Sequence, residues 1–198
     1  MKEQNINEFR KPEFSVDKIF LNRWSPRAMS GEELSDDELM SLFEAAKWAP
    51  SSANSQPWRF IYAKRNSKQW NAIFNLMAEG NQEWAKNASA LIVVISKTTF
   101  DFNNSFSRTH SFDSGSAWMS IALQALLNGL VAHGMSGFDY DKAKTELEIP
   151  DEFQVEAMIA VGKPGKKEVL SERNQKREFP SDRKKLSKIV FEGKFRKQ

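Results

Sequence analysis

The segment from Ala49 to Trp58 concentrates amide and hydroxyl side chains between two prolines. Pro50 and Pro57 fix their own φ angles and carry no N–H, so the residues between them form a short and stiff loop. The polar side chains on this loop include those of Ser51, Ser52, Asn54 and Gln56. Because amides donate and accept hydrogen bonds together, such a loop suits a flat heteroaromatic ring with alternating N–H and C=O groups at its edge. The same residue types also build ordinary connections between a helix and a strand, and residue types alone favour that simpler interpretation.

A second polar group, Arg23, Ser25 and Arg27, surrounds Pro26. Proline pushes the preceding residue into an extended conformation, in which every second side chain points to the same side. Two guanidinium groups and a hydroxyl then converge, and they suit a phosphate monoester because arginine binds phosphate through paired hydrogen bonds. The alternative is a pair of solvated surface arginines, and the spacing alone does not choose between the two.

Hydrophobic periodicity predicts the helices and strands that must position these groups. Ser35 and Glu38 form a capping box, and the apolar residues after them recur at helical spacing until Pro50 ends the helix. An earlier helix is predicted over residues 15–21, with Ser15 or Asp17 as its cap. The other predicted helices cover residues 70–77, 111–130 and 141–147. Apolar and β-branched runs predict strands over residues 58–63, 91–96 and 155–161.

No internal repeat or linker divides the chain, so residues 1–198 are expected to form one domain of the α+β class. Residues 1–14 are predicted to form an N-terminal arm, and residues from about 166 to 198 a charged C-terminal extension. A chain of this length can bury roughly 70% of its unfolded surface, which is enough for a substantial core.

The composition, with 40% hydrophobic, 12% aromatic and 28% charged residues, is typical of soluble globular proteins. No apolar run approaches the roughly 20 residues that a membrane helix needs. The first residues, Met1 to Asn5, lead into no signal-peptide core. The sequence therefore predicts a cytoplasmic protein that does not associate with a membrane.

Cysteine is absent, which excludes disulfides, thiolate nucleophiles and sulfur-ligated metals. His110 and His133 lack the spacing of metal ligands, so local hydrogen bonding is expected of both. No metal site is predicted, and any redox chemistry must come from a bound organic cofactor.

The formal net charge is +3, and many of the basic residues lie in the final third of the chain. They are mixed with carboxylates such as Glu178 and Asp182, and this mixture argues against a groove for nucleic acid. A cofactor that carries one phosphate needs only a few of these cations.

The sequence PSSANSQPW at residues 50–58, preceded by a helix that ends in AAKWA, resembles the flavin-contacting loop of the nitroreductase family. Members of this family are FMN-dependent NAD(P)H oxidoreductases. The resemblance implies a nitroreductase-like fold, in which helices flank a central mixed or antiparallel sheet and the C-terminal arm is exchanged with a dimer partner. It extends over nearly the whole chain, because the remaining motifs follow in the family's order.

The resemblance also implies which residues bind FMN. The phosphate, the ribityl chain and the pyrimidine edge of the ring are held by Arg23, Trp24, Ser25 and Arg27. The loop from the other subunit contributes Ser51, Ser52 and Asn54, with Pro50 and Gln56 beside them. From the C-terminal extension, Arg183 returns to the phosphate, and Lys185 is a weaker match for the same role.

The residues Met135, Ser136 and Gly137 resemble the family's turn whose backbone N–H groups face flavin N5 and O4. Many members have proline and glutamate in this turn, where the present chain has Gly134 and Ser136. The backbone donors remain, whereas any role of the acidic side chain is lost.

Asn81 matches a family asparagine that hydrogen-bonds the flavin ring, although a Gly80–Asn81 helix end explains it equally well. Some relatives carry a lysine three residues later, at the position of Trp84. Its replacement leaves Arg27 as the main positive charge expected near N1 and O2 of the ring.

The predicted function is that of a homodimeric FMN enzyme that takes hydride from NADH or NADPH and reduces a small molecule, such as a nitroaromatic or a quinone, by a ping-pong mechanism. No catalytic side chain is predicted, because solvent can supply the protons. The alternatives are a reductive dehalogenase, an enal or semialdehyde reductase, an oxidase, or a non-catalytic protein that binds flavin or nucleic acid. Residues 98–110 would distinguish the enzymes. Their aromatic side chains either cap a substrate pocket or cover the core, and core is expected for at least one of them.

Overall fold

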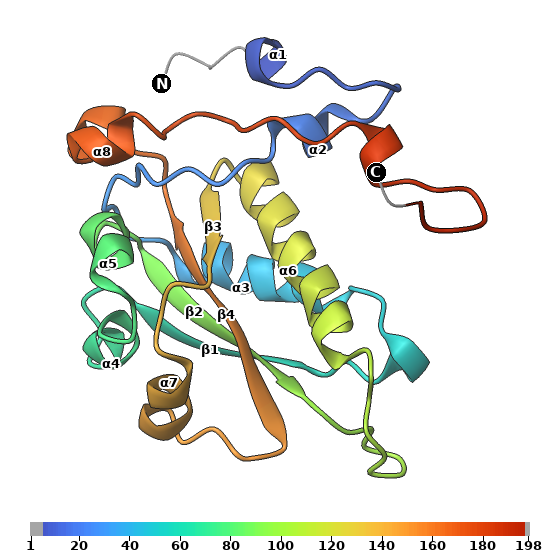
Figure 1. Cartoon of the computed structure of the whole chain (residues 1–198). Helices are drawn as coiled ribbons and strands as arrows, with labels where there is room; N and C mark the ends of the chain where they lie inside the picture. The colour runs from blue at the N-terminus through green and yellow to red at the C-terminus, as the bar shows by residue number, and fades with distance from the viewer. Residues whose placement is uncertain (1–5, 197–198) are drawn as a thin grey trace.

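Four strands rich in apolar and β-branched residues form one sheet in the computed structural model, which describes residues 6–196 (Figure 1). They are β1 (Trp58–Lys64), β2 (Ala90–Lys97), β3 (Val131–Met135) and β4 (Phe153–Gly162), in the spatial order β1-β2-β4-β3. Every neighbouring pair is antiparallel, and the register places Ile92 opposite Tyr62 and Ile159. The α+β class is therefore confirmed.

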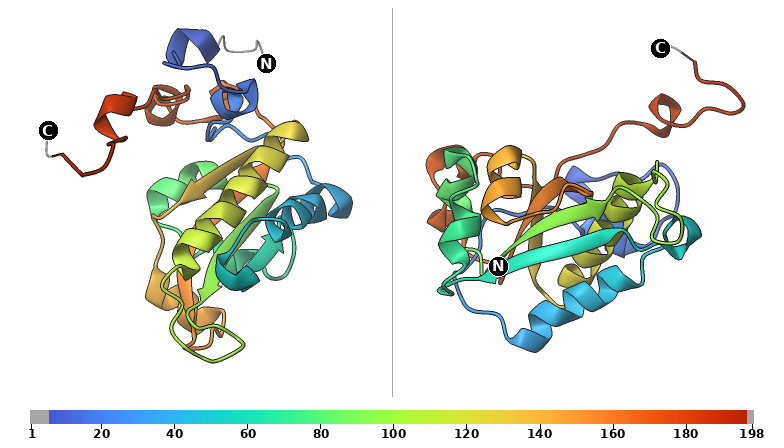
Figure 2. Two further views of the ribbon diagram at one scale, coloured as in Figure 1. Left: turned by 90° about the vertical axis from the view of Figure 1, so that its right-hand side faces the viewer. Right: turned by 90° about the horizontal axis from the view of Figure 1, so that it is seen from below.

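Helices cover both faces of this sheet (Figures 1 and 2). One face carries α3 (Asp36–Lys47) and α6 (His110–Leu127), and the other carries α4 (Trp70–Phe74), α5 (Glu79–Ala85) and α7 (Tyr140–Glu146). Buried side chains of β2 alternate between the faces: Ile92 and Val94 pack with α3 and α6, whereas Leu91 and Val93 pack with the other helices. Complete burial of each such side chain stabilises the fold by about 1.5–3 kcal/mol, so β2 links the layers.

The long helix α6 is apolar on two sides. Toward the sheet it presents Ala117, Ile121 and Ala125, and all three are completely buried. On its outer side Phe112 and Leu127 are 77% and 67% exposed. Large apolar side chains exposed together on one helix are typical of a surface that another molecule covers.

Two predicted helix starts are confirmed. The hydroxyl of Ser35 accepts from the backbone N–H of Glu38, while the Glu38 carboxylate accepts from the N–H of Ser35. Of the two candidate caps for α2 (Lys18–Asn22), the structure uses Asp17, whose side chain accepts from the N–H of Ile19.

Three other boundaries are corrected. The helix predicted over 70–77 ends at Phe74, and Met77 forms an isolated bridge with Phe138 instead. The helix predicted to reach Leu130 ends at Leu127, just before Gly129 adopts a φ of +69°. Residues Val131–Met135 form β3, where no strand is predicted, because pairing with β4 supplies what the local pattern lacks.

The N-terminal and C-terminal segments lie together at the top of Figure 1. Their short helices are α1 (Ile6–Phe9), α2, η2 (Lys167–Val169), α8 (Glu172–Gln175) and η3 (Leu186–Lys188). The buried guanidinium of Arg10 donates to the carbonyls of Leu21, Arg23 and Ser181, and so fastens the two segments to each other. The last part of the C-terminal segment, coloured dark red, extends away from the sheet (Figure 2). Residues 1–5 of the predicted N-terminal arm lie outside the described residues.

In the described part of the chain, no helix combines the length and apolar character that a membrane crossing requires. Within the same residues, no three side chains of the His, Cys, Asp or Glu type come together as a metal site.

Candidate functional site

A cavity of about 440 Å³ opens where α6 crosses β3 and β4. Its lining residues are Arg23, Ser25, Trp118, Met119, Ala122, Gly134, Met135, Ser136 and Ala157. Segments far apart in the sequence thus combine a charged group and a hydroxyl with a mainly apolar surface, which is the usual character of a small-molecule site.

Positive charge gathers at the polar part of this cavity. Arg23 approaches Ser25, with 3.4 Å between Nη1 and Oγ. Burial, and secondly the nearby Arg183, hold the pKa of Arg23 below its ordinary value. Arg10 has its pKa lowered by burial and by both of these arginines, and only Asp182 opposes this. Such crowding of guanidinium groups favours a bound anion, because an anion removes their mutual repulsion.

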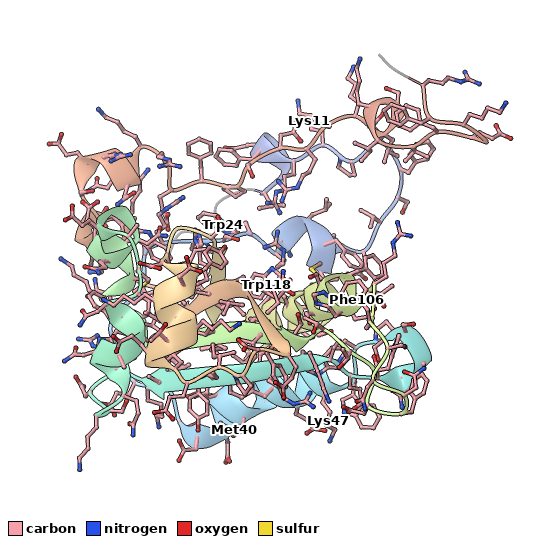
Figure 3. The ribbon with its side chains drawn as sticks, turned by 60° about the horizontal axis from the view of Figure 1, so that its bottom comes forward. Lys11, Trp24, Met40, Lys47, Phe106 and Trp118 are labelled. Carbon is pink, nitrogen blue, oxygen red and sulfur yellow. The ribbon has the colours of Figure 1, made fainter. Side chains whose placement is uncertain are left out.

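The apolar surface of the cavity depends on close contact between Trp118 and β3. A Cβ on Gly134 would come within 3.0 Å of the Trp118 ring, so glycine allows the indole to lie against the strand. Trp118 also packs on the apolar cluster between α6 and the sheet, and Figure 3 labels it among the side chains. Ala122 and Ala157 keep the surface beside it shallow. A flat ring can therefore lie over this surface.

The turn after β3 is held from α5. The amide of Asn81 donates to the carbonyl of Gly137 over 2.9 Å, and the indole N–H of Trp84 donates to the Asn81 oxygen over 3.3 Å. A Cβ on Gly137 would lie 2.7 Å from the Asn81 nitrogen, so only glycine fits without displacement. The interpretation of Gly80 and Asn81 as a helix end is wrong, because both lie inside α5.

Arg27 lies apart from Arg23 and Ser25. It lines a second cavity, of about 210 Å³, with residues of α5 and α8. The carboxylate of Glu178 accepts from the backbone N–H groups of Arg27 and Ala28, and this contact fixes the direction of the chain here. The predicted convergence of three side chains therefore holds for Arg23 and Ser25 but not for Arg27.

His133 is a local hydrogen-bonding residue, as predicted. Its Nδ1 lies 3.0 Å from the carbonyl of Pro26, and its ring lies 4.5 Å from that of Trp84. Burial, with the nearby Arg27 as a smaller cause, lowers the pKa of His133 to about 4. The imidazole is therefore neutral near pH 7 and adds no charge to either cavity.

The loop between the prolines is stiff, as expected. It contains the 3-10 helix η1 (Ser52–Asn54), and Ala53, Asn54 and Gln56 have φ between +46° and +52°. The Ser51 hydroxyl accepts from the backbone N–H of Gln56. Neither cavity is lined by any residue of this loop. Within one chain, the polar side chains of this loop therefore lie outside both cavities.

A buried carboxylate fastens the loop to α6. Asp113, 3% exposed, accepts from the backbone N–H of Ser52 over 3.0 Å and from the Thr109 hydroxyl over 3.1 Å. The sequence gives no signal for this contact, because the two segments are 61 residues apart.

A buried polar cluster at the start of α6 was also not predicted. Ser96 Oγ lies 2.7 Å from His110 Nδ1, and Glu156 accepts from the hydroxyls of Ser96 and Ser111. Glu156 reaches this cluster because the register of β4 shifts at a bulge opposite Val94 and Ile95. The Ser96 hydroxyl and the Glu156 carboxylate both contact Nδ1 of His110. In a hydrolase triad, the serine and the carboxylate contact opposite nitrogens of the imidazole ring. The geometry is therefore that of a local hydrogen-bond network.

The remaining predicted residues lie outside the cavity lining. Trp24 is half-buried beside Arg23 and is labelled in Figure 3. Lys185 is exposed at the N-terminal end of η3. In the 98–110 loop, Phe102 and Phe106 are 70% and 67% exposed. Phe100 is half-buried and packs on Phe102, but none of the three phenylalanines belongs to either hydrophobic core cluster. The expectation that at least one aromatic residue of that loop belongs to the core is therefore wrong.

The chain matches the model of the nitroreductase family over residues 21–81 and 63–163. A protein of Rhodopseudomonas palustris, named provisionally as an NADH dehydrogenase/NAD(P)H nitroreductase, is 28% identical over 150 residues, which are 65% of this chain and 74% of that protein. A crystal structure described as an oxidoreductase containing FMN is 46% identical, has a TM-score of 0.91, and matches 96% of this chain and 97% of that one. An FMN-dependent nitroreductase of Clostridium difficile is 25% identical with a TM-score of 0.59, over 73% of this chain and 84% of that one.

Proposed function

This chain belongs to the nitroreductase family, and we propose that it is a homodimeric FMN enzyme that oxidises NADH or NADPH and reduces a second small molecule, such as a nitroaromatic or a quinone. The observation that carries the proposal is the cavity of about 440 Å³, where Arg23 and Ser25 meet a shallow apolar surface bounded by the turn at Met135. A phosphate joined to a flat ring has the matching combination of groups. One similar protein described as containing FMN and another described as FMN-dependent support the same cofactor.

The phosphate end of FMN fits the cluster of Arg23, Ser25 and Arg183. The lowered pKa of Arg23 reflects burial and then Arg183, so a phosphate there would relieve both unfavourable effects. Arginine suits the role because its planar fork donates two hydrogen bonds to one phosphate.

The ring end fits the surface formed by Trp118, Ala122, Gly134 and Ala157. The backbone at Ser136 and Gly137 bounds this surface, and Asn81 holds Gly137 from behind. Such fixed backbone groups can position a ring edge without reorganising, which is the condition for effective electrostatic stabilisation. Arg27 lines the neighbouring cavity, so its charge would act on the ring only from outside the first cavity, by favouring the negative charge that reduction of a flavin develops.

A second copy of the chain completes the site. The stiff loop that carries Ser51, Ser52 and Asn54 contributes nothing to the lining of its own cavity. Exposed apolar side chains on α6 and on the C-terminal arm supply a surface for dimerisation, and the arm of one copy then lies on the other. The most exposed of them are Phe112, Leu127, Val190 and Phe195.

FMN bound here would supply the hydride-accepting and two-electron chemistry of a ping-pong reaction between NADH or NADPH and the second substrate. The chain itself binds the phosphate, orients the ring and excludes water from one side of it. No side chain is assigned as a general acid, since solvent reaches the open cavity and can supply protons.

An anaerobic stopped-flow experiment tests this proposal. Purified protein should hold about one FMN per chain, the flavin should be bleached by NADH or NADPH, and a nitroarene or quinone should restore its colour. Halophenols and enals in the same panel distinguish a dehalogenase or an enal reductase. Protein that takes up no FMN contradicts the proposal, and bound FMN that neither nicotinamide bleaches makes the protein a flavin carrier.

A further inference from the structure

The second cavity concentrates three guanidinium groups in a small space. It has a volume of about 210 Å³ and lies between α5 and the segment around α8. Its charged lining residues are Arg27, Arg173, Arg177 and Glu83, with Asn81 and Asn174 as neutral polar neighbours. The charge of the lining is therefore positive by two units, from three cations and one carboxylate.

The carboxylates near this cavity are already engaged elsewhere. Glu83 accepts from the buried amide of Asn174 over 3.1 Å, and Glu178 accepts from the backbone N–H groups of Arg27 and Ala28. Among residues 6–196, the ion pairs closer than 4.0 Å include none made by the three arginines of the cavity. All three arginines line the cavity, which places guanidinium donors on its wall.

The electrostatic field supports the same conclusion. Burial lowers the pKa of Arg27, Arg177 lowers it further, and Glu178 offsets only part of this. Arg27 and Arg177 also contribute to the lowered pKa of His133, which lies on β3. Positive charge is thus only partly neutralised, and a bound anion would stabilise the group as a whole.

The size of the cavity limits what can bind. Sites for complete drug-sized ligands usually measure about 300–1,000 Å³, so this cavity suits one ionised group rather than a whole nucleotide. Two or three guanidinium forks can hold the planar or tetrahedral oxygens of a carboxylate or a phosphate through paired hydrogen bonds.

We propose that the cavity formed by Arg27, Arg173 and Arg177 binds the oxyanion of a ligand, either a phosphate or a carboxylate. Asn81 lines this cavity and also holds the turn at Gly137 beside the first cavity, so the anion would lie next to the proposed flavin site. The anion site stands on its own geometry, and only its link to the reaction rests on the proposed function.

Binding of inorganic phosphate tests the site. Isothermal titration is performed on the full chain freed of flavin, at constant ionic strength, in a R23A background that weakens the first cavity's cluster. The double variant R173A/R177A should bind phosphate about a hundredfold or more weakly, since it loses two charge-assisted contacts. The control K68A/K142A removes the same charge from exposed lysines elsewhere and should change nothing.

Equal phosphate affinity in R173A/R177A and in the lysine control would overturn the proposal. Failure of the proposed function gives a different result, because the wild-type chain would then bind no FMN. The phosphate titration tests the anion site in either case.

Steady-state kinetics then identify the source of the oxyanion. If it is the phosphate of the nicotinamide donor, R173A/R177A loses kcat/KM for NADPH about tenfold relative to NADH. If it belongs to the acceptor, the loss appears with 4-nitrobenzoate and not with 4-nitrobenzyl alcohol. Either pattern supports a site that serves the reaction, and loss of phosphate binding without either pattern supports a site for a free anion.

Discussion

The first cavity and the loop at residues 50–57 both carry ligand-type residues, but only the cavity is assembled within one chain. Strand pairing, Trp118 and the contact between Asn81 and Gly137 build the cavity from four separate segments. The loop is equally rigid, with three non-glycine residues at positive φ and an anchor on Asp113, yet it lines neither cavity. In the proposed dimer, this loop would complete the cavity of the partner copy, and the predictions below test that role.

Removal of Arg23 and Arg183, the two arginines that we propose bind the FMN phosphate, should have the largest effect, because it removes positive charge at the polar part of the cavity and leaves the loop unchanged. R23A/R183A is expected to weaken FMN binding about a thousandfold, from two charge-assisted contacts of roughly 1.5–3 kcal/mol each. Fluorescence titration of FMN measures this. K184A/K188A carries the same charge change on exposed neighbours and should stay near wild type. If both double variants lose the same FMN affinity, the loss comes from the change in net charge and not from specific phosphate contacts.

The stability of β3, which lies beside the cavity and carries the buried His133, should depend on pH, whereas the exposed loop has no such group. The pKa of His133 is about 4 in the folded protein, below its ordinary value of 6.5, chiefly through burial. The unfolded chain therefore binds a proton that the folded chain excludes between these values. This contribution to stability is complete above pH 6.5 and is lost as the pH falls toward 4, by up to about 3 kcal/mol.

Urea unfolding from pH 7 to pH 4 measures this loss. H133Q can still donate to the carbonyl of Pro26 but does not titrate, so its free energy of unfolding should depend less on pH. If wild type and H133Q lose stability in parallel, His133 is not the responsible group.

The contact between α5 and the turn after β3 can be tested with one methyl group. G137A should lower the free energy of unfolding by about 2 kcal/mol, since a Cβ would lie 2.7 Å from the Asn81 nitrogen. In a N81A background the same substitution should cost markedly less. The control G115A places a methyl group in open space on α6 and should be neutral or slightly stabilising. An undiminished loss in the N81A background would assign the cost to the backbone instead.

The smallest effect is expected from the loop's anchor. D113A removes the acceptor for the N–H of Ser52, and the freed loop should weaken FMN binding about tenfold in the proposed dimer. D113N keeps one carbonyl oxygen and should restore most of the affinity. Sedimentation checks that both variants remain dimers. If D113A binds FMN as wild type does, then the loop needs no anchor and the comparison with the cavity fails.

Much of the fold follows from local signals. The capping box at Ser35, the helical spacing over α3 and α6, and the continuous apolar run of β2 appear at the predicted places. The strand β3 escapes prediction because five residues that contain Gly134 show no clear period. Its pairing with β4 stabilises it instead. Similarly, the helix predicted over 70–77 shortens because Met77 pairs with Phe138.

The sequence by itself determined the stiffness of the loop at 50–57, the closeness of Arg23 to Ser25 and the identity of the buried strand. These properties depend on backbone restriction and on periods of two or four residues, which act locally. The tertiary structure alone decided that Glu178, 151 residues away, directs Arg27 into its own cavity, and that Asp113 holds Ser52. Such contacts join segments distant along the chain, so they exist only once the sheet and its helices have packed.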